Sequence, residues 1–166
     1  MTIARSKLVD EDVTPWYHCI SRTVRKAFLL GEGDVDRKQW IEDRLRELCG
    51  VFAVQCAGFA VMDNHLHLLL RLDSAAAAAW SDEEIARRWV RLFPLPGDEE
   101  VVAQATEEWV QQKSADADWV TRARQRLNSL GWFMKCLKEP LARMANRAEG
   151  CTGVWQNSLA LSGRNR

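Results

Sequence analysis

The stretch FAVQCAGFAVMDNHLHLLLRL, residues 52–72, decides the fold of this 166-residue chain. Residues 52–62 are apolar on both alternating faces, a pattern typical of a β-strand inside a sheet. Residues 65–72 alternate differently, with leucine alone on one face and two histidines, a leucine and an arginine on the other. Asp63-Asn64 between the two runs is turn chemistry. The stretch therefore predicts an antiparallel hairpin with a two-residue turn.

The residues before this hairpin predict a strand and a helix. Residues 16–23, WYHCISRT, are rich in aromatic and β-favouring residues and follow a proline, so we expect a strand there. A helix can start at Asp34 or Asp36 and run to about Cys49, with an apolar stripe of Ile41, Leu45 and Leu48. Strand, helix, strand, strand is the opening of a ferredoxin-like or RRM-like sandwich. The predicted fold class is therefore α+β, an antiparallel sheet with helices on one face.

The residues after the hairpin predict a helical insertion at about 81–128. Ala75–Ala79 is expected to be a short low-complexity linker. Ser81 and Glu84 form a capping box for the first helix of the insertion. Further helices are expected from Asp98, from Asp116 or Asp118, and from about 129 to 146, the last interrupted or kinked at Pro140.

Composition excludes several classes of protein. The chain has 23 basic and 23 acidic residues, which by itself argues against a non-specific nucleic-acid binder. Residues 113–166 nevertheless carry 10 basic and 4 acidic groups, which fits phosphate binding or an ordinary solvated helix surface. The five cysteines form no close pair, so neither a disulfide framework nor a zinc ribbon is expected. No apolar run reaches the length of a membrane span, so we expect a cytoplasmic protein without a membrane partner.

His65 and His67 are the first candidates for a functional site. Two side chains at i and i+2 on a strand point the same way, so their ring nitrogens can meet one divalent cation. A phosphoryl-transfer enzyme uses such a cation to polarise the scissile phosphate. A pair of half-buried sheet histidines without a ligand has the same spacing, so the spacing alone leaves both interpretations open. The sequence does not identify a third ligand.

Four segments of the chain carry a resemblance to one known family. They are WYHCISR at 16–22, Asp36-Arg37 with Trp40-Ile41, AVMDNHLHLLLR at 60–71, and Gly153-Val154-Trp155-Gln156. In this order they resemble the single-tyrosine HUH transposases, which include the REP-associated and insertion-sequence 200-like tyrosine transposases. That family has a first strand close to Y-H-V-x-x-R, a His-apolar-His motif, and a G-x-x-W-Q element, which is one residue shorter here.

The resemblance implies a DNA transposase of a mobile element that acts in DNA recombination. In that family a tyrosine attacks a phosphodiester of single-stranded or hairpin DNA and becomes covalently linked to its 5′ phosphate. The resemblance implies that His65 and His67 hold a divalent metal, Mg²⁺ or Mn²⁺. It also implies single-stranded DNA as the partner, and a homodimer as one of two oligomeric states.

The end of the chain departs from the family. Its one tyrosine, Tyr17, matches the first-strand tyrosine and not the nucleophile. The residues after Gln156 also differ from the family's W-Q-x-R-F continuation. We therefore expect 1–156 to be an incomplete transposase domain that lacks its final strand and nucleophile helix, and 157–166 to be a non-matching tail. No catalytic residue is assigned, and the chain is expected to be inactive in strand cleavage.

Further candidates are less specific. Arg22 and Arg71 are candidates for phosphate binding, and ordinary surface ion pairs explain them equally well. His18 can line the metal face or be a hydrogen-bonded sheet histidine. The tryptophans are expected to be core residues rather than a base-stacking platform. A DNA-facing side is predicted on the basic final helix, with a solvated face as the alternative, at Lys135, Lys138, Arg143 and Arg147.

A second function competes with the enzyme. A ferredoxin-like sheet with a basic helix can hold nucleic acid without cutting it. The alternative is therefore a non-catalytic nucleic-acid-binding module, or a regulatory remnant of a mobile element.

Overall fold

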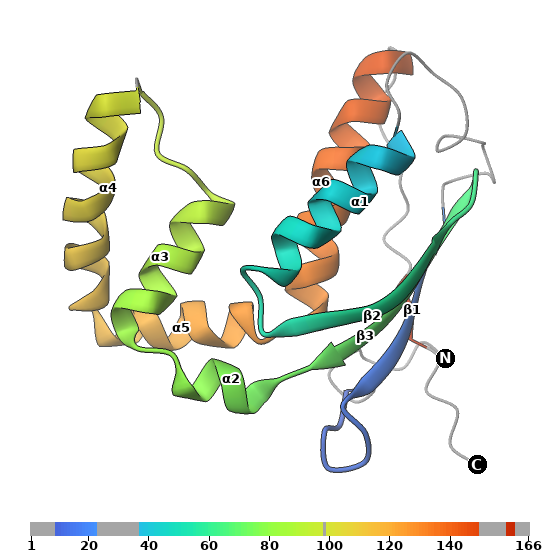
Figure 1. Ribbon diagram of the computed structural model, residues 1–166, viewed down its shortest axis with the longest axis horizontal. Helices are drawn as coiled ribbons and strands as arrows, with labels where there is room; N and C mark the ends of the chain where they lie inside the picture. The colour runs from blue at the N-terminus through green and yellow to red at the C-terminus, as the bar shows by residue number, and fades with distance from the viewer. Residues whose placement is uncertain (1–8, 23–36, 98, 150–158, 162–166) are drawn as a thin grey trace.

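The computed structural model describes residues 9–22, 37–97, 99–149 and 159–161. Its helices and strands form a sheet layer, a helical layer and a helical arm (Figure 1). In chain order they are β1 (Trp16–Arg22), α1 (Arg37–Cys49), β2 (Val54–Val61), β3 (His65–Leu72), α2 (Ser74–Ala79), α3 (Asp82–Leu92), α4 (Glu99–Ser114), α5 (Ala117–Leu127), α6 (Leu130–Glu149) and β4 (Leu159–Leu161).

The strands form one antiparallel sheet in the order β2-β3-β1-β4, which is the ferredoxin-like order. The predicted α+β class is confirmed. The predicted hairpin is also confirmed, because Val61 faces Leu66 and the Met62 amide donates to the His65 carbonyl at 2.9 Å. β1 pairs with β3 along its whole length, from Trp16 opposite Arg71 to Arg22 opposite His65.

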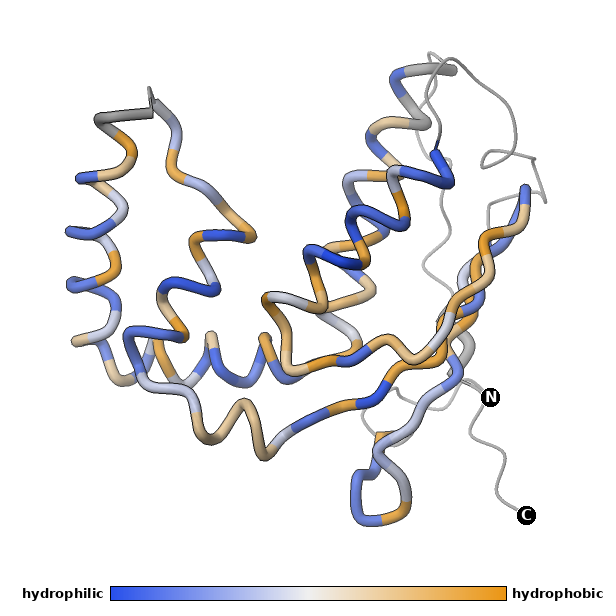
Figure 2. Tube along the Cα trace, viewed as in Figure 1, coloured by the Kyte–Doolittle hydropathy of each residue, from blue (hydrophilic) through white to orange (hydrophobic). Residues whose placement is uncertain are grey.

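The leucine face of β3 forms the centre of the core. Its four leucines, at 66, 68, 70 and 72, are all buried. Helices α1 and α6 cover this face of the sheet (Figure 1), and the α1 stripe of Ile41, Leu45 and Leu48 is buried as predicted. Figure 2 shows the resulting distribution, with hydrophobic residues along the strands and hydrophilic residues on the outer sides of the helices. Burial of these side chains removes apolar surface from water and stabilises the sandwich.

The position of β2 corrects one prediction. β2 lies at the edge of the described sheet and not inside it, and residues 57–60 are exposed. An apolar run cannot reveal which side of β3 the distant strand β1 will pair with. The register also shifts between Cys56 and Gly58, a β-bulge of the kind common at sheet edges.

Two other expectations are wrong. The alanine run 75–79 is not a linker, because Ser74–Ala79 is a short helix whose N-cap Asp73 accepts a hydrogen bond from the Ala76 amide at 3.1 Å. Alanine is the best helix former, so one capped turn is enough to organise this run. The final strand is not missing either, because Leu159–Leu161 in the supposed tail pairs with Cys19–Ser21 of β1 as β4.

The predicted helical insertion forms an arm of α3, α4 and α5 that projects from the sheet (Figure 1). The caps at Ser81 and Asp116 are confirmed, since each side chain accepts a backbone hydrogen bond from the residue three positions on. Helix α6 continues through Pro140 rather than stopping there. The proposed caps at Asp34, Asp36 and Asp98 and the 153–156 element lie outside the described residues.

Two further features bear on the class of protein. The described cysteines, at 19, 49, 56 and 136, are all free thiols. No helix in the described part of the chain is both long and apolar enough to cross a membrane.

Candidate functional site

All three histidines of the chain lie on the sheet face opposite the leucine core. Strand alternation puts His65 and His67 of β3 on this face, and the register with β1 adds His18 and Arg22 to it. The helices α1 and α6 lie on the other side of the sheet. His18 is exposed, and the two β3 histidines are partly buried. The sheet therefore presents a histidine face, defined here as His18, Arg22, His65 and His67.

His18 and His67 are joined directly. The His18 Nε2 atom lies 2.9 Å from His67 Nδ1, and the two rings are stacked with centroids 5.1 Å apart. The His65 ring stands nearly at right angles to the His67 ring, with centroids 4.9 Å apart. One of the two bonded nitrogens must carry the proton. If His67 Nδ1 donates, His67 Nε2 keeps a free lone pair.

His65 has its own partner in the turn. Its Nδ1 atom lies 2.5 Å from the Asn64 side-chain oxygen. An amide oxygen only accepts hydrogen bonds, so His65 Nδ1 donates and His65 Nε2 carries the lone pair. Metal-binding histidines are typically held in this way, with the second ring nitrogen donating to an oxygen. Asn64, the residue before the His65–His67 pair, therefore fixes the orientation of the His65 ring. The sequence pattern did not reveal this role.

The surroundings favour a neutral His67. Loss of hydration lowers the pKa of His67 below the usual value of 6.5, and the neighbouring His18, His65 and Arg22 lower the pKa further. A neutral imidazole is the form that ligates a metal. At neutral pH His67 therefore offers a nitrogen lone pair on this face.

The described residues provide a histidine pair and not a complete metal site. Within the described ranges, no group of three or more His, Cys, Asp or Glu side chains is arranged to hold a metal ion. His18 is close to His67, but as a hydrogen-bond partner. A cation at His65 and His67 would therefore complete its coordination with water, with an oxygen of a bound ligand, or with a side chain outside the described residues.

The candidate arginines are not brought together. Arg22 stands opposite His65, whereas Arg71 lies at the other end of β3, six residues away, which is about 20 Å along a strand. Arg71 is held by Asp73 at 3.2 Å and by Gln55. Arg22 thus belongs to the histidine face, and the structure does not bring Arg71 next to it.

The predicted basic side of α6 is only partly present. Lys138 is buried, which rules out a DNA-facing role for it. Lys135, Arg143 and Arg147 are exposed. Glu139 forms ion pairs with Lys135 at 3.6 Å and with Arg143 at 4.0 Å. These residues lie on the helical side of the molecule, away from the histidine face.

Tyr17 lies on the core side of β1. It is 5% exposed, and burial raises the pKa of its phenol above 10. Strand alternation points it away from His18 and His67. The tyrosine is therefore a packed core residue that cannot reach a phosphate bound at the histidine face.

The fold and this face define a ferredoxin-like α+β domain with a histidine-bearing sheet surface. No protein-family model matches the chain, and no curated protein matches it. Among solved structures, it is similar to the crystal structure of a "putative transposase" from Deinococcus radiodurans, at 20% identity and a TM-score of 0.30. That alignment covers 59% of this chain and 89% of the other. A likeness this distant carries no argument about function.

Proposed function

We propose that this chain is a transposase-like DNA-binding protein whose histidine face holds a divalent cation beside a phosphate of single-stranded DNA. One observation carries the proposal. His65 and His67 project from one side of β3, and each has a ring partner that can leave its Nε2 atom free for a ligand. The resemblance of residues 60–71 to the HUH motif gives the same assignment.

Each residue of the face has a distinct role in this proposal. His65 and His67 bind the cation through Nε2, and Asn64 and His18 are positioning residues that fix the two rings. Arg22, opposite His65, contacts the DNA phosphate. The cation supplies charge stabilisation to the phosphate oxygen. The side chains of Leu66 and Leu68 fix the strand in the core behind the site.

The ligand atoms favour one of the two expected metals. Mg²⁺ prefers oxygen ligands in a nearly ideal octahedron, whereas imidazole nitrogen suits transition metals better. Mn²⁺ accepts nitrogen and oxygen ligands together and binds the same site more tightly than Mg²⁺. We therefore expect Mn²⁺ to support DNA binding at lower concentration than Mg²⁺.

The position of Tyr17 favours binding over cleavage for this chain. The only tyrosine of the 166 residues is buried on the opposite side of the sheet. The second candidate function, a non-catalytic nucleic-acid-binding module, therefore has specific support. A regulatory role toward a related transposase is compatible with it.

A binding assay tests the proposal. Fluorescence anisotropy of a labelled single-stranded hairpin oligonucleotide is measured with Mn²⁺ and with a chelator. We expect Mn²⁺ to tighten binding to the native chain and to leave His65→Ala/His67→Ala unaffected. Leu69→Ala is the matched control, because Leu69 is exposed on the same face of the same strand. Equal stimulation of the native chain and the double variant contradicts the proposal.

A strand-cleavage assay on the same oligonucleotide separates the two functions. Binding without nicking supports the module. Nicking that requires Mn²⁺ and both histidines supports a cleaving enzyme.

A further inference from the structure

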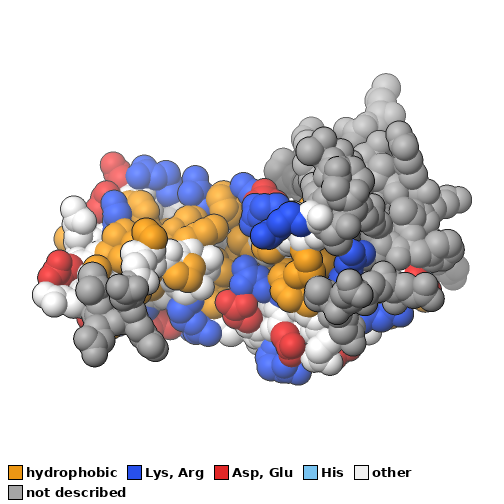
Figure 3. All heavy atoms as spheres, turned by 90° about the horizontal axis from the view of Figure 1, so that it is seen from above, with side chains coloured by type: hydrophobic (Ala, Val, Ile, Leu, Met, Phe, Trp, Pro, Cys, Tyr) orange, Lys and Arg blue, Asp and Glu red, His pale blue; other side chains and the backbone are white. Residues whose placement is uncertain are grey.

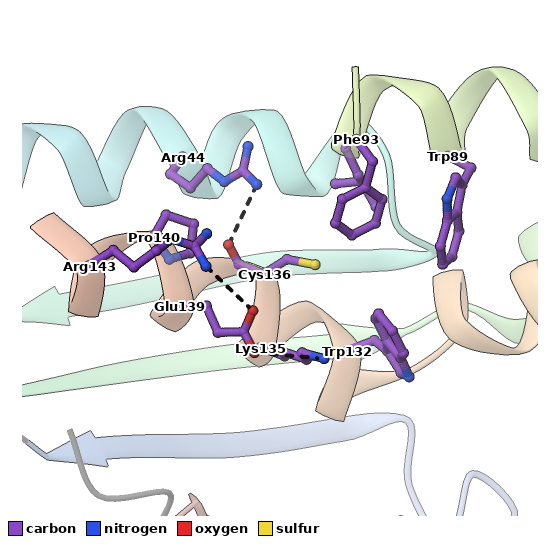
Figure 4. Close-up of a pocket in the computed structure, with 10 residues that line it drawn as sticks. Arg44, Trp89, Phe93, Trp132, Lys135, Cys136, Glu139, Pro140 and Arg143 are labelled. Carbon is purple, nitrogen blue, oxygen red and sulfur yellow. Dashed lines mark hydrogen bonds and ion pairs between the residues drawn. The ribbon is translucent and has the colours of Figure 1, made fainter. Parts of the chain in front are cut away.

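A cavity lies where the helical arm meets the helical layer. It has a volume of about 360 Å³ and is lined from α1, α3 and α6 and by Phe93, which follows α3 (Figure 4). Its volume is within the usual range for small-molecule sites. Because α1 and α6 cover the leucine face of the sheet, this cavity and the histidine face lie on opposite sides of the sheet (Figure 1).

One part of the cavity wall is aromatic. The Trp89 ring centroid lies 5.2 Å from that of Phe93 and 6.0 Å from that of Trp132. Phe93 is 46% exposed, and the two tryptophans are partly buried. Leaving a phenylalanine this exposed beside two indole rings gives a planar ligand an apolar surface to contact. Trp89 and Trp132 are expected from the sequence to be core residues, but they are only partly buried at the margin of the core and also line the cavity.

The rest of the wall carries charged side chains beside Leu92, Cys136 and Pro140. Arg44, Lys135 and Arg143 line the cavity together with a single carboxylate, Glu139, and Arg44 is ion-paired with Glu47 at 2.6 Å. Glu139 is shared between Lys135 and Arg143 at 3.6 and 4.0 Å, so one negative charge faces two positive ones. The Arg126 guanidinium lies 4.6 Å from the Trp132 ring centroid and adds a further positive charge nearby. Viewed from above, hydrophobic side chains reach the surface between the arm and the helical layer, bordered by lysine and arginine (Figure 3).

We propose that this cavity binds a splayed-out base of single-stranded DNA, with the adjoining phosphates at Lys135 and Arg143. An aromatic wall with surplus positive charge matches the two parts of a nucleotide, a planar base and an anionic phosphate. A purely apolar peptide would make no use of the positive charge that the single Glu139 carboxylate leaves unbalanced between Lys135 and Arg143. A simple anion would leave the aromatic wall unused. The choice of DNA rests on the proposed function, but the cavity shares no residue with the histidine face.

The cavity is tested in a chelator, so that the histidine face contributes no cation-dependent binding. Affinity for a fluorescein-labelled oligothymidine is measured by anisotropy over a range of salt concentrations. Phe93→Ala is expected to weaken binding roughly tenfold, since stacking on one ring contributes that order of affinity. Phe59→Ala is the matched control, because Phe59 has the same 46% exposure and lies on β2.

The phosphate contacts have a separate readout. Lys135→Ala/Arg143→Ala is expected to lower the slope of log affinity against log salt by roughly 0.7 for each lost contact. Arg147→Ala, on the same helix and outside the cavity lining, is expected to leave the slope unchanged. Native affinity and native slope in both cavity variants would overturn the proposal, as would an absence of binding by the native chain.

Photocrosslinking locates the base directly. A single strand carrying 5-iodouracil is irradiated with the protein, and the modified peptide is identified by mass spectrometry. Crosslinks at Trp89, Phe93 or Trp132 support the cavity. Crosslinks confined to β1 and β3 overturn it while leaving the histidine face intact. If His65→Ala/His67→Ala loses Mn²⁺ stimulation but keeps the cavity crosslinks, the histidine face and the cavity act independently.

Discussion

His18 Nε2 lies 2.9 Å from His67 Nδ1, and this bond connects β1 to the histidine pair of β3. The two residues are 49 positions apart in the chain and are brought together by the antiparallel register of the two central strands. The bond holds the His67 ring and gives His18 a positioning role. The short distance also places His18 among the groups that lower the pKa of His67.

The first prediction concerns the protonation of His67. In metal-free protein, ring NMR signals are expected to give a pKa for His67 below 6.5, because loss of hydration and the neighbouring His18, His65 and Arg22 disfavour its charged form. His18→Ala is expected to raise this pKa, since it removes one of those groups. A His67 pKa above 6.5 in the native chain would contradict the described surroundings.

The lowered pKa of His67 also determines how folding stability changes with pH. Below pH 6.5 the unfolded chain binds the His67 proton more tightly than the folded chain does. The His67 contribution to folding is therefore most favourable above pH 6.5. It becomes less favourable as the pH falls from 6.5 through the lowered pKa.

The second prediction tests the register of β3. Leu68→Ala is expected to lower the free energy of unfolding by about 2–5 kcal/mol, because Leu68 is fully buried and its loss leaves a cavity. Leu69→Ala is expected to change it by less than about 0.5 kcal/mol, because Leu69 is 43% exposed. Denaturant titration measures both. An equal loss in the free energy of unfolding for the two variants would mean that Leu68 and Leu69 do not lie on opposite faces of β3 as described.

The third prediction concerns the arm. Arg87 of α3 donates to Glu107 of α4 at 2.6 Å and to Glu83 of its own helix at 2.8 Å. The hydrogen bond from Arg87 lowers the pKa of Glu107 below 4.5. Its stabilising effect is therefore present above pH 4.5 and is lost as the pH falls through the lowered pKa.

Thermal melts of Glu107→Gln check this sign. The variant is expected to have a slightly lower Tm than the native chain at neutral pH and the same Tm well below pH 4.5. Glu108→Gln, an exposed substitution on the same helix, is the control. A Tm difference that persists at low pH would show that the variant acts through something other than the ion pair.

The fourth prediction concerns covalent chemistry. The 166-residue chain is expected to form no phosphotyrosine adduct with a hairpin oligonucleotide, because Tyr17 is buried on the far side of the sheet from the histidines. A denaturing gel with a labelled oligonucleotide detects such an adduct. An adduct that disappears in Tyr17→Phe would refute the core role of this residue.

Much of the fold could be predicted because local patterns determine it. The leucine alternation of 65–72 and the Asp63-Asn64 turn specify the hairpin, and the Ile41, Leu45, Leu48 stripe specifies α1. The caps at Ser81 and Asp116 likewise depend on a few neighbouring residues. The histidine pair was visible for the same reason, since both side chains belong to one strand.

The remaining features depend on contacts distant in sequence. The edge position of β2 follows from which side of β3 pairs with β1, and β4 is too short to have a pattern of its own. Burial of Lys138 depends on how α6 is turned against its neighbours. The cavity between α1, α3 and α6 required all three helices to be placed, so no motif in the sequence indicated it.

Calorimetric titration with Mn²⁺ is the most direct test of the central claim that His65 and His67 together hold a divalent cation. The native chain and Leu69→Ala are expected to bind Mn²⁺ with the same affinity, and His65→Ala/His67→Ala is expected to show no binding heat. Unchanged Mn²⁺ binding in the double variant, or none in the native chain, would contradict the account.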